Sequence, residues 1–273
     1  MKSATVATPR PRWAWPEYGM EGALLGLFMV SACFFTVALE HPASPLHTAL
    51  RDPLLRRALI GLAMGSTAIC LILSPWGQQS GAHMNPAVTL TFWRLGRVRA
   101  HDALCFLVAQ ALGAIAGVGV SRLLLGARLA DPAVNYAVTL PGARGMSVAF
   151  LAEFTISALL MLVVLIVGES TRWAPRTPFI AGSLVALYIT FEAPLSGMSM
   201  NPARSLGSMV WAGGFSSFWI YLLAPPLGML TSAGLFTASR GLALVHCAKL
   251  HHDNDKRCIH CGARFKSSWE EAA

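Results

Sequence analysis

The sequence predicts an all-α polytopic membrane protein with six transmembrane helices and two re-entrant half-helices, arranged as an inverted repeat. Three observations lead to this prediction. First, 55% of the 273 residues are hydrophobic and only 12% are charged, a composition too apolar for a soluble domain. Second, six apolar runs approach the length of about 20 residues that a spanning helix needs. Third, one short motif occurs twice, at residues 80–88 and 196–204, with six of nine positions identical.

The apolar runs define the spans in chain order, and the fifth is short enough that we expect it to extend into its flanks. They cover residues 19–39, 54–73, 103–125, 146–167, 178–193 and 217–236. Residues 1–18 form a polar, proline-rich tail without the features of a cleaved signal peptide. The expected organisation is this tail, a membrane domain of residues 19–240 with halves at about 19–125 and 146–240, and a Cys/His-rich tail of residues 241–273.

Each copy of the repeated motif predicts a loop that leads into a short helix. Asn85 and Asn201 are typical N-cap residues, and Pro86 and Pro202 follow at the first helical position, where a missing N–H costs nothing. Each helix then runs for about ten residues, or roughly 15 Å, which is half of the ~30 Å hydrocarbon core. One loop follows the second span and the other follows the fifth, so they enter from opposite sides and can meet at mid-membrane.

The basic residues predict the orientation of the chain in the membrane. An even number of spans places both termini on one side, which then carries fourteen lysines and arginines against six on the other, with Arg204 set aside. This asymmetry favours cytoplasmic termini and accounts for most of the net charge of +8. We expect no nucleic-acid partner, because no basic cluster lies on a soluble domain large enough to present it.

Two carboxylates lie at equivalent places in the two halves. Glu21 is in the first span and Glu153 is in the fourth. A carboxylate in lipid is costly unless it finds donors or water. We therefore expect both to face inward and to brace the motif loops, as structural groups rather than as a proton relay.

These features resemble the aquaporin, or major intrinsic protein, family, in its bacterial form, over roughly residues 19–240. The resemblance rests on paired Asn-Pro-Ala motifs within six spans, with Arg204 directly after the second: Asn85, Pro86, Ala87, Asn201, Pro202 and Ala203. It implies an aquaporin-like channel domain that assembles as a homotetramer in the cell (inner or plasma) membrane, with one pore per subunit. It also implies passive conduction of water or small uncharged solutes, with no cofactor required.

The resemblance also implies an outer selectivity filter of four residues. They fall at Gly65, Ile189, Met198 and Arg204. A strict water channel usually has an aromatic residue at the first position and His at the second, so a wider filter is expected here, for solutes such as glycerol-like polyols, urea or metalloid hydroxides. Ser205 stands where glycerol facilitators usually carry Asp, so neither subtype is matched. Gly61 and Gly65 also form a helix-contact pattern, which leaves packing and filter roles open for Gly65.

The pore would select against charge. The resemblance implies pore-lining carbonyl groups at Gly81, Ala82, His83, Gly197, Met198 and Ser199. The positive N-terminal ends of both half-helices, together with Arg204, would oppose a cation whose idealised desolvation costs on the order of 20 kcal/mol. A neutral hydroxyl solute costs only a few kcal/mol to desolvate, and carbonyl groups can replace its water.

Two other functions remain open at this point. A secondary transporter also uses inverted repeats and broken helices, but it needs carboxylates near the midplane, and the candidates Glu21, Glu153 and Glu192 lie at span ends. A mainly structural or adhesive role is the second alternative, and the intact Asn-Pro-Ala-Arg sequence argues against loss of the pore. No nucleophile–base pair or phosphate-binding loop is visible, so an enzyme is not expected.

The C-terminal tail predicts a structural zinc site. Cys258 and Cys261 have the spacing of a metal knuckle, and Cys247 and His251 lie four residues apart, on one face if the last helix continues. Together they form a Cys₃His set of the kind zinc prefers, in a compartment where thiols stay reduced. The substitute fourth ligands are His246, His252 and His260. The alternative is a disordered polar tail with incidental cysteines.

Overall fold

The structure is a computed structural model that describes residues 4–5 and 13–265 of the chain. The N-terminal tail predicted for residues 1–18 therefore falls largely outside the described residues. The same holds for four of the fourteen basic residues assigned to the cytoplasmic side, Lys2, Arg10, Arg12 and Lys266. The first half of the fold contains α1 (Trp15–Glu40), α2 (Pro45–Ala49), α3 (Pro53–Leu73), α4 (Pro75–Ser80), α5 (Pro86–Arg94), α6 (Ala100–Leu125), η1 (Gly126–Ala130) and η2 (Asn135–Ala137). The second half contains α7 (Met146–Glu169), η3 (Ala174–Arg176), α8 (Thr177–Phe191), α9 (Ala193–Ser196), α10 (Pro202–Ala212), α11 (Phe218–Arg240) and η4 (Leu242–Leu244).

The predicted spans are present as helices, and the all-α membrane fold is confirmed. Within the described residues, α1, α3, α6, α7 and α11 are long and apolar enough to cross a membrane. The fifth predicted run forms α8, which has 15 residues and is followed directly by the single turn of α9. Beyond the bundle, β1 (Ala4–Thr5) pairs antiparallel with β2 (Arg264–Phe265).

The helices pack in pairs that are related between the two halves. Helix α1 lies against α6 in the first half, and α7 lies against α11 in the second. Helix α3 of the first half lies against α8 of the second. Glycine permits the closest of these approaches, because a Cβ atom at Gly113 or Gly117 of α6 would overlap the backbone of α1. Small residues at helix contacts are the usual basis of tight packing in membranes, where no hydrophobic force drives helices together.

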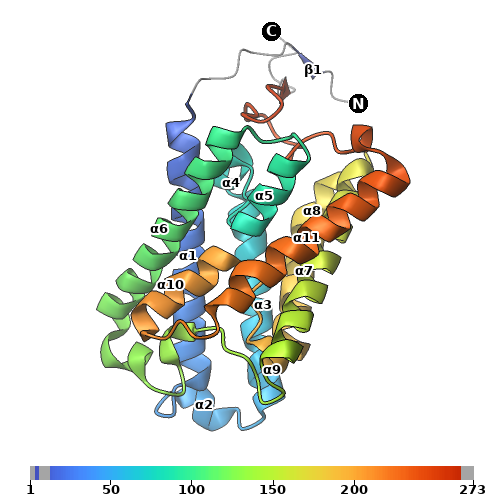
Figure 1. The fold of residues 1–273 in the computed structure, drawn as a ribbon. Helices are drawn as coiled ribbons and strands as arrows, with labels where there is room; N and C mark the ends of the chain where they lie inside the picture. The colour runs from blue at the N-terminus through green and yellow to red at the C-terminus, as the bar shows by residue number, and fades with distance from the viewer. Residues whose placement is uncertain (1–3, 6–12, 266–273) are drawn as a thin grey trace.

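The two half-helices enter the bundle from opposite ends (Figure 1). The loop before α5 enters from the end at which α1 begins and α11 finishes, which we call the tail end, and α5 runs back from the centre towards that end. The loop before α10 enters from the opposite, far end. Both have buried faces inside the ring of long helices, which is the arrangement the doubled motif predicted.

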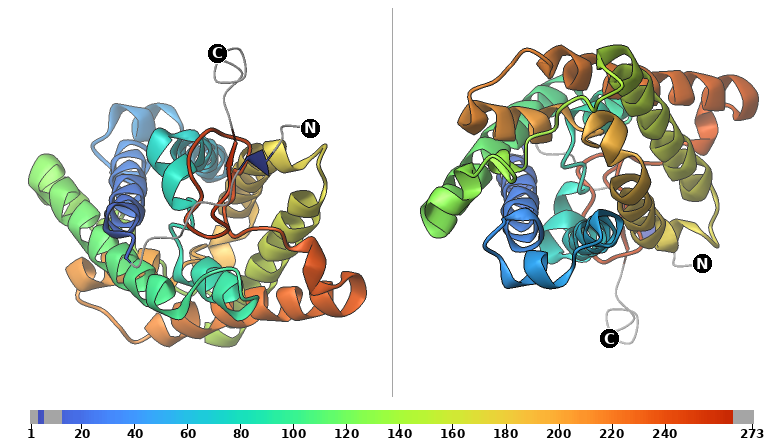
Figure 2. Two further views of the ribbon diagram at one scale, coloured as in Figure 1. Left: turned by 90° about the horizontal axis from the view of Figure 1, so that it is seen from above. Right: turned by 90° about the horizontal axis from the view of Figure 1, so that it is seen from below.

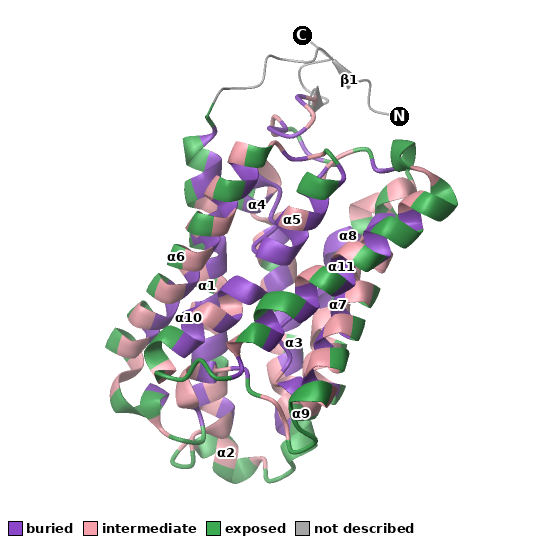
Figure 3. Ribbon diagram, in the orientation of Figure 1, coloured by how far each residue is buried: buried purple, intermediate pink, exposed green. Residues whose placement is uncertain are grey.

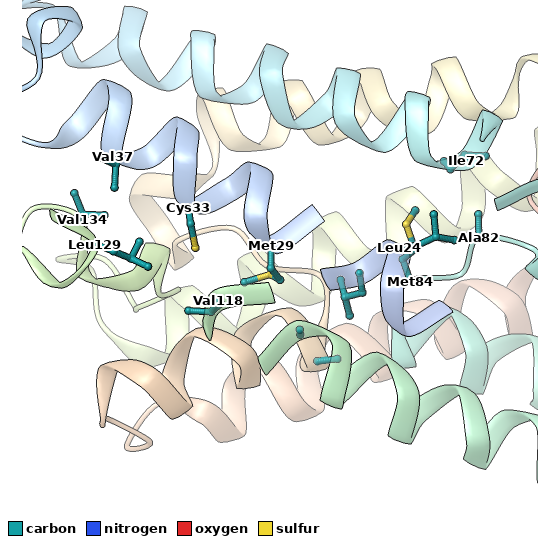
Figure 4. Close-up of a cluster of buried hydrophobic side chains, with 13 residues drawn as sticks. Leu24, Met29, Cys33, Val37, Ile72, Ala82, Met84, Val118, Leu129 and Val134 are labelled. Carbon is teal, nitrogen blue, oxygen red and sulfur yellow. The ribbon is translucent and has the colours of Figure 1, made fainter. Parts of the chain in front are cut away.

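Burial follows the expectation for a protein surrounded by lipid (Figure 3). Large apolar side chains remain exposed on the outer faces of the long helices, including Leu62, Leu104, Leu123, Leu151 and Leu235. The interior is also apolar, and one of its two main clusters joins α1 to α3, α6 and the first motif loop through Met29, Cys33, Ile72, Val118 and Met84 (Figure 4). A chain that is apolar outside and inside, with several helices of spanning length, is a multi-pass membrane protein.

Candidate solute pore

A cavity of about 480 Å³ runs through the bundle between the two motif loops. At the far end its lining includes Glu40, Arg56 and Arg57, and towards the tail end it includes Leu160, Val164 and Leu250. Residues from both motif loops line its middle, among them Asn85 and Asn201. The cavity thus follows the path that two half-helices meeting inside a bundle would frame.

The two motif loops share an unusual backbone conformation. Gly81, Ala82 and Met84 in the first loop have positive φ angles, and Gly197, Met198 and Met200 repeat the pattern in the second. A non-glycine residue in the left-handed region costs roughly 1–2 kcal/mol, so other contacts must hold each loop in this conformation.

Glu21 supplies those contacts for the first loop. Its carboxylate accepts hydrogen bonds from Ser80 Oγ at 2.8 Å and from the backbone N–H groups of His83 and Met84 at 3.0 and 2.7 Å. Gln110 Nε2 donates a further bond at 2.9 Å. Both carboxylate oxygens are therefore occupied inside the protein.

Glu153 has the equivalent position in the second loop. It accepts hydrogen bonds from Ser196 Oγ at 2.8 Å and from the backbone N–H groups of Ser199 and Met200, both at 2.7 Å. Like Glu21, it is completely buried. Because each acid is committed to loop donors, the geometry supports the bracing role and leaves neither free to carry an ion or a proton.

The motif asparagines cap the half-helices and also link the two loops. Asn85 Oδ1 accepts from the Ala87 N–H at 2.8 Å, and Asn201 Oδ1 accepts from the N–H groups of Ala203 and Arg204 at 3.1 and 3.2 Å.

Each side-chain amide then reaches across the centre. Asn85 Nδ2 donates to the Met200 carbonyl, and Asn201 Nδ2 donates to the Met84 carbonyl, both at 2.7 Å. An amide nitrogen carries two hydrogens, so each retains a second N–H at the cavity wall. Pro86 and Pro202 occupy the first helical positions, as predicted.

Three of the four predicted filter residues line the cavity together: Ile189, Met198 and Arg204. Arg204 Nη1 is buried and has no hydrogen-bond partner among the described residues. A buried donor without a partner is costly, so this group is available to a solute oxygen.

The filter prediction for Gly65 is wrong. A Cβ atom at Gly65 would overlap the carbonyl of Gly182 in α8, and one at Gly61 would overlap the carbonyl of Ala186. Gly65 therefore belongs to the contact between α3 and α8. The α3 residues that line the cavity include Ile60, Met64 and Ala68 instead.

Ser205 has a structural place beside the filter. Its hydroxyl lies 2.7 Å from Thr139 Oγ1 and 2.6 Å from Ser199 Oγ, and all three groups are buried. Ser205, which departs from the glycerol-facilitator pattern, thus connects the segment between η2 and α7, which contains Thr139, to the second motif loop.

The predicted carbonyl positions divide into two groups. Ala82, His83, Gly197 and Ser199 line the cavity, together with Met198. Gly81 does not, because its carbonyl accepts a hydrogen bond from the backbone N–H of Leu250 at 3.1 Å. This contact with the C-terminal tail could not be read from the sequence, and it removes Gly81 from the predicted pore set.

The tail brings four potential metal ligands together, with one change from the prediction. The ligand atoms of Cys247, His252, Cys258 and Cys261 all lie within 4.8 Å of one another. His251 is not in this group. Its assignment assumed that the last helix continues, whereas α11 ends at Arg240 and residues 245–265 are not helical. His252, one of the substitute ligands, takes the place of His251.

Comparison with known proteins gives a consistent result. The family profile described as Major intrinsic protein matches residues 21–236. Aquaporin NIP6-1 of Arabidopsis thaliana is 35% identical over 181 residues, which is 66% of this chain and 57% of that protein. Nodulin-26 of Glycine max is 36% identical over 165 residues, 60% of this chain and 59% of that protein. The chain therefore spans less than two thirds of these relatives, and as plant proteins they do not support the bacterial type suggested by the sequence.

The fold also matches a solved structure. The structure of the aquaglyceroporin from Plasmodium falciparum superposes on this chain with a TM-score of 0.71. The match covers 85% of this chain and 98% of the aquaglyceroporin chain. At 20% sequence identity, this likeness bears on the fold alone.

Proposed function

Because the chain belongs to the major intrinsic protein family, we propose that it forms a passive transmembrane channel for water and small uncharged solutes. The observation that carries this proposal is the cavity in which both motif asparagines and Arg204 meet. The channel is a homotetramer in the cell membrane, by resemblance to the family, and its tail end faces the cytoplasm, because the basic residues predict that side.

The charges around the cavity oppose cations. The N-termini of α5 and α10 both point to the centre, and each carries about half a positive charge. Arg204 adds a full one. Among the lining residues that the structure describes, the only carboxylate is Glu40, whose Oε2 lies 3.1 Å from Arg56 Nε. A cation would therefore lose its hydration without gaining a free anionic partner, which also speaks against an ion-coupled transporter.

The chemistry of the wall suits small neutral solutes. Ile189, Met198 and Met200 contribute apolar side chains to the wall. The carbonyl groups, the asparagine amides and Arg204 offer hydrogen bonds. Solutes with hydroxyl or amide groups can exchange water for these groups at little cost. The absence of an aromatic residue and a histidine at the filter favours glycerol-like polyols, urea or metalloid hydroxides in addition to water.

Stopped-flow measurements on proteoliposomes test this proposal directly. We expect the full-length protein to increase permeability to water, glycerol and urea above that of protein-free vesicles, without an ion current. Uptake should persist when ion gradients are collapsed, unlike that of a coupled transporter. A pore that passes water but excludes glycerol as tightly as an aromatic/His filter would contradict the wide filter.

A bulkier residue at the filter should separate water from larger solutes. In Ile189→Phe, the added ring enters the cavity and narrows it. A misfit of one methylene group or more changes discrimination between solutes by about tenfold or more, so glycerol permeability should fall by at least that factor. Water permeability should fall much less. Ile166→Phe, on the exposed face of α7, is the matched control. Equal losses for both solutes would show that Ile189 does not set the solute size.

A further inference from the structure

We propose that Cys247, His252, Cys258 and Cys261 bind one zinc ion, and that the zinc-bound tail closes the tail-end mouth of the pore with Leu250. The metal site stands independently of the channel function. The closure rests on the proposed function, because only a conducting pore can be closed.

The four ligand atoms already have nearly the spacing that zinc requires. Cys247 Sγ lies 3.3 Å from Cys258 Sγ, and His252 Nε2 lies 3.1 Å from Cys261 Sγ. In tetrahedral zinc sites with metal–sulfur bonds of about 2.3 Å, ligand atoms are separated by roughly 3.5–3.8 Å. All six separations here are at most 4.8 Å, and the three cysteines are not in disulfides. Thiolates with an imidazole favour zinc over harder cations.

The segment between Cys258 and Cys261 folds as a tight turn. The Gly262 N–H donates to the Cys258 carbonyl at 2.9 Å, and the Cys258 N–H donates to the Ala263 carbonyl at 2.9 Å. Gly262 has a φ of +78°, which a residue with a side chain rarely adopts. The turn brings the sulfur atoms of Cys258 and Cys261, three residues apart in the chain, close enough to bind the same metal ion.

The charge around the cluster complements a bound metal. A zinc ion with three thiolates and a neutral histidine has a net charge of −1. Lys249 is 6% exposed and interacts electrostatically with all three cysteines. A lysine is rarely buried without an anionic partner, and the metal-bound thiolates would supply one.

The tail is attached directly to the first motif loop. His260 Nε2 donates to the Ser80 carbonyl at 3.1 Å, the Leu250 N–H donates to Gly81, and His83 Nε2 donates to the Ala248 carbonyl at 2.8 Å. The rings of His83 and His260 stack with centroids 5.4 Å apart. Seen from the tail end, the tail lies over the centre of the ring of helices (Figure 2, left).

Leu250 separates the pore from the tail end. A second cavity of about 310 Å³ is lined by Cys247, His252 and Cys261, among others. The two cavities share two lining residues, Val164 and Leu250. These two apolar side chains therefore lie where the two cavities adjoin, and Leu250 is held there by the hydrogen bond from its backbone N–H to the Gly81 carbonyl.

Zinc is what would hold this segment in place. The described part of the tail, residues 241–265, is below the roughly 40 residues under which a chain usually needs a metal or a disulfide to stay folded. In such small units, metal binding supplies the folding free energy. Loss of zinc should release the turn, and with it Leu250, from the mouth of the pore.

The metal content of the purified full-length protein tests the site. We expect one zinc per chain by elemental analysis in the wild type and in Cys70→Ser, a matched control on the surface of α3. The double variant Cys258→Ser/Cys261→Ser should contain almost none. Equal, near-zero zinc in all three proteins, or a Cys247–Cys258 disulfide found by mass spectrometry of freshly purified wild type, would overturn the site.

Solute flux into proteoliposomes tests the closure. Leu250→Ala should retain its zinc but increase solute permeability about tenfold. This is the change expected if about ten wild-type channels are closed for each open one and the variant is mainly open. A membrane-permeant zinc chelator should raise wild-type flux similarly and leave the double cysteine variant unchanged.

The outcomes separate the two proposals. The closure would be overturned if zinc-loaded wild type and Leu250→Ala had the same solute flux and chelation changed neither. The channel function would stand in that case. Flux no greater than in protein-free vesicles for every one of these proteins would overturn the channel function, whereas the zinc measurement would be unaffected.

Discussion

Replacing Glu153 by leucine is expected to prevent the second half of the bundle from folding. Three donors, Ser196 Oγ and the N–H groups of Ser199 and Met200, would lose their acceptor in a completely buried position. An unsatisfied buried donor costs about 1–3 kcal/mol, and the left-handed backbone of the loop would lose its support. We expect little folded protein after detergent extraction, measured by size-exclusion chromatography and thermal unfolding.

A second variant controls for the simple loss of a carboxylate. Glu169→Leu, at the end of the same helix, removes an ion pair with the exposed side chain of Arg240, and pairs of that kind contribute about 1 kcal/mol or less. Its folded yield should stay near that of the wild type. A Glu153→Leu protein that folds and conducts normally would show that the loop does not depend on this acid.

The repeated elements could be predicted because both copies carry their own local signals. Each motif has an N-cap asparagine and a proline at the first helical position, and each half has an acid at the equivalent place. The sequence positions of Glu21 and Glu153 were therefore enough to predict that these acids support the motif loops. The apolar runs likewise predicted the helices, since length and composition decide which segments cross a membrane.

The errors occurred where the answer depends on contacts between distant segments. Counting back from the motif placed Gly65 in the filter, but the face that α3 presents to the pore is set by its packing against Gly182 and Ala186 of α8. Similarly, His251 depended on a helix that ends at Arg240. The hydrogen bonds from Leu250 and His260 to the first motif loop have no sequence pattern, so these contacts between the tail and the pore could be found only in the structure.

Replacing Arg204 by valine is expected to relax selectivity while the protein still assembles. The guanidinium lines the cavity, and its Nη1 has no partner among the described residues, so the group can serve the permeating solute. A hydrogen bond to a charged group contributes about 1.5–3 kcal/mol, and 1.4 kcal/mol corresponds to tenfold in rate. Discrimination between glycerol and larger polyols should therefore weaken by about tenfold or more in stopped-flow assays, and a small cation leak should appear.

Folding should tolerate this change because the backbone, not the guanidinium, belongs to the helix cap. The Arg204 N–H donates to Asn201 Oδ1 at 3.2 Å, and valine keeps that group. A cation in the first turn also opposes the helix dipole by about 0.3–1 kcal/mol, so its removal should not weaken α10. Arg144→Val, at an exposed position in the loop before α7, is the matched control and should leave selectivity unchanged. If Arg204→Val yields no folded protein while Arg144→Val does, the guanidinium supports the bundle, and the selectivity of the pore must come from Ile189, Met198 and the loop carbonyls alone.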